Sequence, residues 1–390
     1  MRIAFISLMG DAPWGGSEVL WTQTAARALV DGHEVLASVY AWPEVPVHFQ
    51  DLSRAGAQLF FRSRYEPTLR YRASSWLDRA AHGGELPEIR ALSKFGPEVV
   101  LVSQGGWIDL LFQIQLHQWL RRVPFVLVCH NYHDPVDLPG NLRSRVLDMF
   151  GLAQEVLMIS ANQLRTVRRQ LIAPLATARI IQNPLNLPAV YPVSRNPCLD
   201  GTLQLAVVAS FHVYRKGQDV LLEALSAPEW ANRNVHINFY GTGPDQTCLE
   251  ELVQFYSLAD RVTLRGHVAD TAAIWQDNDL LIIPSRIESG PMVLPEAMLC
   301  GRPVVAADVG MVREWLDDDE TGFIADTSSA ISLNKALERA WARRDEWPAM
   351  GALAAERVRP RLEKDPVGDL LRRLVFLGTQ TLGAGRARGN

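Results

Sequence analysis

The segment that most constrains this chain spans residues 280–307, L-L-I-I-P-S-R-I-E-S-G-P-M-V-L-P-E-A-M-L-C-G-R-P-V-V-A-A. It begins and ends with the continuous apolar runs Leu280–Ile283 and Val304–Ala307, and such runs are typical of parallel strands covered on both faces. The prolines between them suit the first turn of a helix, and Gly301 suits its end. The segment therefore predicts a buried strand, a loop, a short helix, a turn and a second buried strand.

The start of this short helix has the properties of an anion site. The first amides of a helix have no acceptor within it, and the aligned peptide dipoles add about half a positive charge at that end. A phosphate is well suited to such a place. The residues expected to line it are Ser289, Gly290, Pro291, Met292, Val293 and Leu294.

Two carboxylates, Glu288 and Glu296, flank this anion site in the sequence. Side chains on a helix lean toward its N-terminus, so Glu296 is expected to reach the bound group, and Glu288 is expected to face it from the loop. A carboxylate would repel a phosphate, so we expect these two to hold hydroxyl groups. A phosphate beside two hydroxyl-binding carboxylates indicates a nucleotide sugar.

The spacing Glu288-x7-Glu296, with the preceding Pro-Ser and the following Gly-Arg-Pro-Val-Val, resembles the signature of the family 4 retaining glycosyltransferases. The alternative interpretation is a surface helix that carries two solvated glutamates. The resemblance implies an α/β fold of GT-B architecture, in which two Rossmann-like parallel-sheet domains face each other across a cleft. It also implies that Glu296 binds the ribose hydroxyls and Glu288 those of the transferred sugar.

The domain organisation follows from apolar runs that alternate with helical segments along the 390 residues. A chain of this length suggests two domains, with three as the alternative. We expect an N-terminal, acceptor-side domain over residues 1–186, a Pro-rich linker over 187–202 and a nucleotide-sugar-binding domain over 203–362. A last helix within 363–382 would cross back to the first domain.

The composition argues against several classes of protein. The net charge of −4 gives no nucleic-acid signature. The four cysteines contain no CxxC pair, which predicts neither disulfides nor a zinc site. No run approaches a membrane span, and the N-terminus does not read as a signal peptide. We therefore expect a cytoplasmic protein without metal or cofactor, with a peripheral contact to the inner face of a membrane left open.

The N-terminal loop Gly15-Gly16-Ser17-Glu18 follows a buried strand and precedes a helix. It is similar to the G-G-x-E loop of the same transferases, which lies beside the diphosphate and the acceptor. The resemblance implies that Gly15 and Gly16 contact the donor and Glu18 lies on the acceptor side. The alternative is a plain loop in which Ser17 caps the helix.

His130 follows the apolar run Phe125–Cys129, at the strand end where open α/β sheets bind ligands. The resemblance places it near the transferred sugar, although a lone histidine is usually structural. Asn131, Gln104 and Gly105 are expected beside it on the acceptor side. His133 and Asp134 read as loop polar residues, because no convincing third metal ligand accompanies them.

Lys216-Gly217 matches a Lys-Gly of the family whose lysine binds the diphosphate and neutralises charge on the leaving group. The family usually has an arginine just after the preceding strand, where this chain has Ser210. Arg215 is expected to supply the lost charge, or the site works with one cation fewer. Glu288, His130 and Lys216 are the predicted catalytic residues.

Two further segments resemble the donor-binding half of the family. Gly241 opens a G-x-G-P loop, and Gly266-His267-Val268 resembles the stretch whose backbone reads the nucleobase. Contacts made by backbone atoms do not depend on the identity of the side chains, so the sequence does not identify the base.

Aromatic and arginine residues alternate at 60–65 and 69–72. A nucleic-acid surface would use such residues, and so would a peripheral membrane contact. The resemblance implies acceptor or lipid contacts in this part of the N-terminal domain. A solvated insertion with half-buried aromatic residues is the alternative.

These observations predict a retaining glycosyltransferase that moves a sugar from a nucleoside-diphosphate sugar of UDP or GDP type to a glycan, lipid-linked or small-molecule acceptor. No carboxylate is obviously placed as a nucleophile, and the resemblance implies a same-face attack in which the leaving phosphate takes the acceptor's proton. A divalent metal is not expected, because cations and amides already cover the phosphate. Two alternatives remain: a GT-B sugar-nucleotide epimerase, and a non-catalytic module that binds nucleotide sugar.

Overall fold

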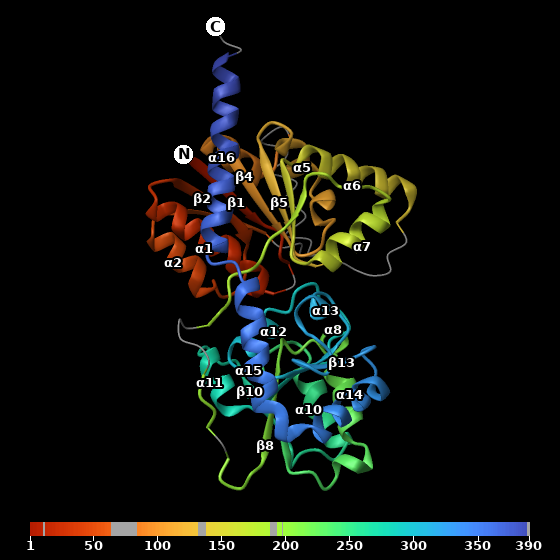
Figure 1. The fold of residues 1–390 in the computed structure, drawn as a ribbon. Coiled ribbons are helices and arrows are strands. Elements are labelled where there is room, and N and C mark those ends of the chain that lie inside the picture. Colours follow the sequence, from red (N-terminus) through yellow and green to blue (C-terminus); the bar gives the residue numbers. More distant parts are fainter. Residues whose placement is uncertain (11, 64–83, 132–137, 188–192, 197, 388–390) are drawn as a thin grey trace. The chain divides into compact units, whose positions relative to one another are not determined.

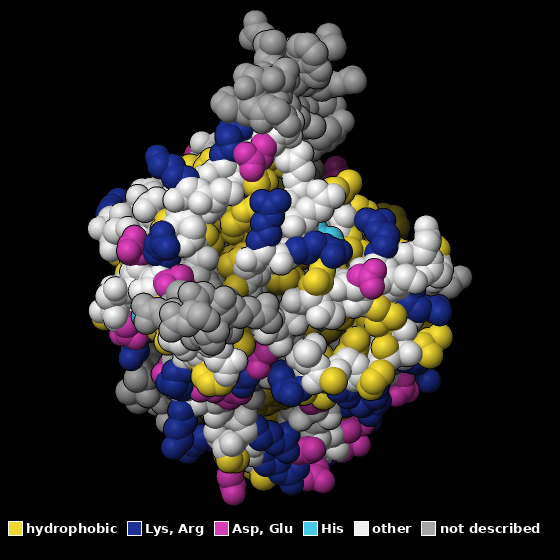
Figure 2. Space-filling model, turned by 90° about the horizontal axis from the view of Figure 1, so that it is seen from above, with side chains coloured by type: hydrophobic (Ala, Val, Ile, Leu, Met, Phe, Trp, Pro, Cys, Tyr) yellow, Lys and Arg dark blue, Asp and Glu magenta, His cyan; other side chains and the backbone are white. Residues whose placement is uncertain are grey.

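The computed structural model describes the chain except for residues 11, 64–83, 132–137, 188–192, 197 and 388–390, which are grey in Figure 1 and in Figure 2. The chain forms two compact units. The first unit comprises residues 1–184 and 363–390, and the second comprises residues 185–362. Among the described residues, no helix is both long enough and apolar enough to cross a membrane.

The first unit is built on a seven-stranded sheet in the order β3-β2-β1-β4-β5-β6-β7, with every neighbouring pair parallel. Its strands are β1 Arg2–Ser7, β2 Glu34–Tyr40, β3 Gln58–Arg62, β4 Val99–Gln104, β5 Phe125–Cys129, β6 Glu155–Met158 and β7 Ala178–Ile180. Its helices are α1 Gly16–Val30, α2 Val47–Arg54, α4 Pro87–Phe95, α5 Ile114–Leu120, α6 Gly140–Leu152, α7 Ala161–Leu171 and α16 Pro366–Ala387.

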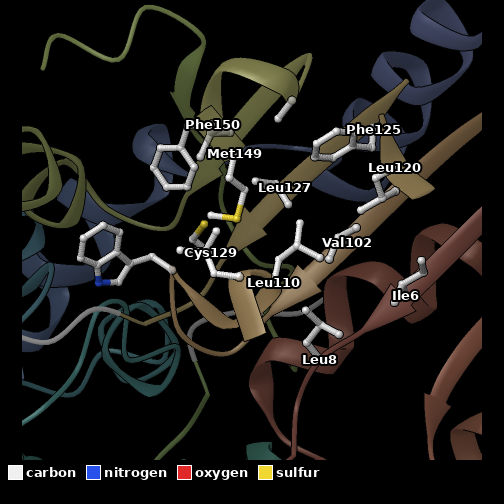
Figure 3. Close-up of a cluster of buried hydrophobic side chains, with 14 of the residues drawn as sticks. Ile6, Leu8, Val102, Leu110, Leu120, Phe125, Leu127, Cys129, Met149 and Phe150 are labelled. Carbon is white, nitrogen blue, oxygen red and sulfur yellow. The ribbon is translucent and has the colours of Figure 1, made fainter. Parts of the chain in front are cut away.

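Helices cover both faces of this sheet (Figure 1). Residues of α1, α2 and α16 pack on one face, and residues of α4 to α7 pack on the other. Figure 3 shows part of the second layer, where Leu127 and Cys129 of β5 point toward Met149 and Phe150 of α6. A sheet that is buried on both faces explains why its central strands are apolar without interruption.

The second unit has a six-stranded parallel sheet in the order β10-β9-β8-β11-β12-β13. Its strands are β8 Leu203–Val208, β9 Val235–Tyr240, β10 Val262–Gly266, β11 Leu280–Ile283, β12 Val304–Ala307 and β13 Gly322–Ala325. Its helices are α8 Val213–Lys216, α9 Gln218–Leu225, α10 Gln246–Phe255, α11 Thr271–Asp277, α12 Val293–Leu299, α13 Val312–Trp315, α14 Ala330–Ala342 and α15 Trp347–Val358.

The prediction of two Rossmann-like parallel-sheet domains is confirmed. The expected strand, loop, helix and strand of residues 280–307 are β11, α12 and β12. Strand β3 and helix α2 were not predicted. The final helix also continues to Ala387, well beyond the expected end.

Candidate functional site

The loop that carries Lys216 is held against the loop after β11. Gly217 has a left-handed backbone (φ +67°), and a Cβ there would lie 2.0 Å from the carbonyl oxygen of Pro284. The amides of Arg286 and Ile287 both donate to the carbonyl of Arg215, at 2.9 and 3.2 Å. Only glycine permits this approach, which brings Lys216 beside the loop that carries Glu288.

Lys216 and Glu288 form an ion pair. Their side chains are 20% and 13% exposed, so the pair is largely shielded from solvent. The hydroxyl of Ser285 donates to the same carboxylate oxygen at 3.3 Å. The cation expected to bind a diphosphate and the carboxylate expected to hold sugar hydroxyls therefore bond to each other in this structure.

Ser210 lies exposed after β8, next to the glycine loop that follows β9. A Cβ on Gly241 would lie 2.0 Å from the carbonyl oxygen of Ala209, and one on Gly243 would lie 2.4 Å from that of Phe211. The two loops are thus in direct backbone contact, which explains the need for glycine at both positions.

The start of α12 corrects one prediction. The amide of Leu294 donates to the carbonyl of Pro291 at 3.0 Å, so the prediction that it is free for an anion is wrong. In the described part of the chain, the amides of Met292 and Val293 have no backbone hydrogen-bond acceptor. The helix begins at Val293, and the anion site is therefore limited to the turn before it.

Ser289 is 1% exposed, and its hydroxyl has no hydrogen-bond partner among the described residues. A Cβ at Gly310 would lie 2.6 Å from the carbonyl oxygen of Ser289 and 2.7 Å from that of Glu288. The loop that carries Glu288, Ser289 and Gly290 is therefore closely supported from the turn after β12. A buried hydroxyl without a partner is costly, so it offers a ligand an unused hydrogen bond.

Glu296 is 5% exposed and accepts a hydrogen bond from the amide of Asn186 at 3.1 Å. Burial raises its pKa to about 7, because a charge is disfavoured away from water. The two carboxylates therefore differ: Glu288 has a cation beside it, whereas Glu296 has an amide and a large desolvation cost.

The predicted base-reading stretch begins where β10 ends. Gly266 has φ +70°, and its carbonyl accepts from the amide of Gly241 at 2.8 Å. His267 is exposed and Val268 packs partly against the core of the second unit. The stretch adjoins the glycine loop through Gly266, so the predicted base and phosphate segments are neighbours.

In the first unit, Glu18 is 2% exposed. Its carboxylate accepts from the Ser7 hydroxyl and the Trp21 indole, each at 2.9 Å, and burial raises its pKa to about 7. Gly15 is the N-cap of α1, with Gly16 the first helical residue, so the alternative of a Ser17 cap is wrong. The Glu18 side chain thus connects the end of β1 to α1 inside the first unit.

His130 is buried at the end of β5, with Nε2 3.1 Å from the hydroxyl of Ser103. Its Nδ1 has no partner among the described residues. Burial lowers the pKa of His130 to about 4, which keeps the ring neutral near pH 7. A neutral ring with one unpaired nitrogen can accept or donate one further hydrogen bond.

Gln104 is fully buried, and its side chain bonds Trp107, Cys129 and Leu110. The prediction that this side chain faces an acceptor is therefore wrong. The carbonyl of Gly105 accepts from the amide of Asn131 at 2.7 Å, which continues the pairing of β4 and β5 past their ends.

Arg62 was expected in a surface contact but is buried, paired with Glu88 and stacked on Tyr40. Residues 64–83, and with them the rest of that pattern, lie outside the described residues, as do His133 and Asp134. Asn186 and Ser103 were not singled out from the sequence, and Ser285 entered only as part of the Pro-Ser that precedes Glu288. Only Ser285 had a signal, since it lies three positions before Glu288.

Comparison with known proteins connects these segments to one family. Residues 202–343 match the family model described as "Glycosyl transferases group 1". The matched range contains Ser210, Lys216, Glu288 and Glu296.

Curated relatives match part of the chain. One subunit of the phosphatidylinositol N-acetylglucosaminyltransferase of Arabidopsis thaliana is 27% identical over 241 residues, 60% of this chain and 53% of that protein. The GDP-mannose-dependent alpha-(1-6)-phosphatidylinositol monomannoside mannosyltransferase of Mycobacterium tuberculosis is 30% identical over 165 residues, 40% of this chain and 43% of that protein. The chain thus matches about half the length of these relatives.

The fold also matches solved structures. Anabaena Alr3699/HepE in complex with UDP and glucose superimposes with a TM-score of 0.69 and 16% identity, covering 99% of this chain and 100% of that one. At this identity the likeness concerns the fold, which is that of GT-B proteins.

Proposed function

We propose that this chain, whose residues 202–343 match the model of the group 1 glycosyl transferases, is a member of that family and moves a sugar from a nucleoside-diphosphate sugar to an acceptor hydroxyl. The observation that carries the proposal is the Lys216–Glu288 ion pair, placed on two interlocked loops of the second unit. The names of the relatives, which include a GDP-mannose-dependent enzyme, and the UDP bound in a structural neighbour support a donor of UDP or GDP type.

The ion pair suggests how donor binding prepares the site. A diphosphate competes with Glu288 for the ammonium group of Lys216 and carries more charge than a single carboxylate. Once Lys216 turns to the diphosphate, Glu288 is free to accept hydrogen bonds from sugar hydroxyls. The amides of Met292 and Val293 and the Ser289 hydroxyl add neutral donors, and Glu296 takes the ribose hydroxyls.

For the reaction we propose a retaining, same-face displacement, as the resemblance to the retaining family implies. The bond between the anomeric carbon and the diphosphate oxygen breaks, and its electron pair leaves with the diphosphate, beside Lys216. The acceptor oxygen bonds to the anomeric carbon on the face that the diphosphate leaves, and its proton passes to a leaving-group oxygen. Stabilising the developing negative charge is the main contribution of the protein, and the cationic and amide donors make a divalent metal unnecessary.

On the acceptor side we propose that His130 and Asn131 contact the reacting hydroxyl or the transferred sugar. The neutral ring of His130, with its unpartnered Nδ1, suits a hydrogen bond to a hydroxyl. The two relatives described above carry phosphatidylinositol-type substrates in their names, which favours a lipid-linked acceptor and a peripheral membrane contact.

The test is calorimetry with UDP, GDP, ADP and TDP, followed by turnover of the sugar donors of whichever nucleotide binds. We expect one nucleotide to bind, and turnover to require an acceptor and to survive a chelator. A donor changed without any acceptor would indicate an epimerase instead. Binding without any turnover would indicate a non-catalytic module.

A further inference from the structure

Helix α7 presents one continuous exposed stripe to solvent. The residues Arg165, Arg168, Arg169 and Ile172 are all exposed and follow the spacing i, i+3, i+4 and i+7. Residues at this spacing share one face of a helix. Leu164, Val167 and Leu171, on the opposite face, are buried in the core of the first unit. We call the four exposed residues the α7 stripe.

The positive charge of the α7 stripe is not balanced along the chain. Residues 156–199 contain five arginines and no aspartate or glutamate. Arg179 on the neighbouring strand β7 is also exposed. Ile172 adds an exposed apolar side chain to the same helix face. The region therefore offers cationic and apolar groups together.

Ile172 is the unusual member of the stripe. It ends α7 in the left-handed conformation (φ +54°) with 75% of its surface exposed. A β-branched residue is a genuine outlier there, where glycine or asparagine is usual. Because the side chain is exposed, its packing does little to offset the backbone strain. Backbone strain of this kind is a starting point for a functional hypothesis.

Helix stability alone does not explain the stripe. Arginines near a helix C-terminus interact favourably with its dipole, which accounts for Arg168 and Arg169. It does not account for Arg165, one turn earlier, or for an exposed, strained isoleucine. A polyanion such as a nucleic acid would use the arginines but would gain nothing from Ile172. An anionic bilayer uses both, because phospholipid phosphates attract the guanidinium groups and an apolar side chain enters the acyl boundary.

We propose that the α7 stripe is the surface by which this protein docks on an anionic phospholipid membrane. The choice of a lipid surface over other polyanions rests on Ile172, and the inference rests on the proposed function only in connecting this surface to a lipid-linked acceptor. Arg165 also donates to Asn162 at 2.9 Å, which directs only one of its N–H groups inward.

The test is co-sedimentation of the full chain with phosphatidylcholine vesicles and with the same vesicles containing phosphatidylglycerol. Two variants are compared, R165Q/R168Q/R169Q and Ile172→Gly. The matched control is Ile331→Ser, which removes an isoleucine of 74% exposure from α14 in the second unit. Each arginine near an anionic surface changes binding by about fivefold, so the triple variant should lose on the order of a hundredfold.

Ile172→Gly should weaken vesicle binding severalfold while its melting temperature stays the same or rises, because glycine relieves the strain. The Ile331→Ser control should bind like wild type. Absence of binding to anionic vesicles, equal binding to neutral ones, or full binding by both stripe variants would overturn the proposal. Loss in the arginine variant alone would overturn the choice of a lipid surface.

Nucleotide calorimetry on the same variants separates the two proposals. We expect nucleotide affinity to be unchanged in all of them, because the α7 stripe belongs to the first unit and the nucleotide-binding loops to the second. If the chain bound anionic vesicles through the α7 stripe but bound no nucleotide, the proposed function would be contradicted and the membrane-docking proposal would stand.

Discussion

Lys216 and Glu288 are 72 positions apart in the chain and form a largely shielded ion pair. Two glycines, Gly217 and Gly310, allow the backbone approaches that hold their loops in place. Each partner is the other's counter-ion until a ligand arrives. Binding of the nucleotide and positioning of the sugar should therefore be coupled through this pair.

The first prediction separates the two members of the pair. In Glu288→Gln the ammonium of Lys216 is no longer shared, so nucleotide affinity should be kept or raised. Turnover should fall by about 10²–10³-fold, the size seen when one group that stabilises a transition state is removed. In Lys216→Met both nucleotide affinity and turnover should fall, and nucleotide binding should be weaker by roughly tenfold or more. Equal losses of nucleotide binding in the two variants would contradict the coupling.

The second prediction concerns Ser210, where the family usually has an arginine. Its side chain is exposed after β8, so a longer side chain has room there. Ser210→Arg should tighten nucleoside-diphosphate binding by roughly ten- to a hundredfold, because a charge-assisted hydrogen bond contributes about 1.5–3 kcal/mol. Ser210→Gln, which adds length without charge, is the control and should change little. If both variants bind alike, Ser210 does not lie at the diphosphate.

The third prediction concerns the loop contact at Gly217. Gly217→Ala must move the backbone of Pro284 as well as adopt φ +67°. We expect a loss of roughly 3–5 kcal/mol in the free energy of unfolding, combining backbone strain and overpacking. Gly201→Ala is the matched control, since its φ is +74° and its Cβ would enter open space. That control should lose only about 1–2 kcal/mol, and equal losses would mean that the loop contact is unimportant.

The fourth prediction is a pH dependence of stability through Glu296. Burial raises its folded pKa from 4.5 to about 7, so the folded chain keeps a proton that the unfolded chain releases in this window. The stabilising effect of that proton is complete below pH 4.5 and is lost as pH rises toward 7, by about 3 kcal/mol in total. Glu296→Gln stays neutral and should not show this loss.

Chemical denaturation of wild type and Glu296→Gln between pH 4 and 8 checks this prediction. The difference in unfolding free energy should grow in favour of the variant from about pH 4.5 to 7 and then level off. Glu18 also has a pKa raised to about 7, but it is present in both proteins and cancels in the difference. If the unfolding free energies of the two proteins changed in parallel with pH, ionisation of Glu296 would not destabilise the folded chain, and the prediction would be wrong.

Much of the fold was predictable from the sequence, because strands buried on both faces must be apolar and glycines must stand where backbones touch. The β11–α12–β12 segment follows directly from these rules. Strand β3, Q-L-F-F-R, was missed because its aromatic and arginine residues suggested a surface, whereas Arg62 is buried against Glu88 and Tyr40.

The site was less predictable, because partners come from loops that only the fold brings together. No spacing rule pairs Lys216 with Glu288 or places the amide of Asn186 on Glu296. The Leu294 amide was expected to be free as one of the first amides of the helix, but the turn before the helix gives it an acceptor, the carbonyl of Pro291. Glu18 and Gln104 were identified as site residues, yet their side chains are used inside the first unit.

The most direct test of the account is NMR of the product formed from an α-linked nucleoside-diphosphate sugar, using wild type and Glu288→Gln at equal concentration. We predict an α-configured product from wild type, only in the presence of an acceptor, and a severe loss of product in the variant. A β-configured product would contradict the same-face mechanism. Undiminished transfer by Glu288→Gln would contradict the central role of the Lys216–Glu288 pair.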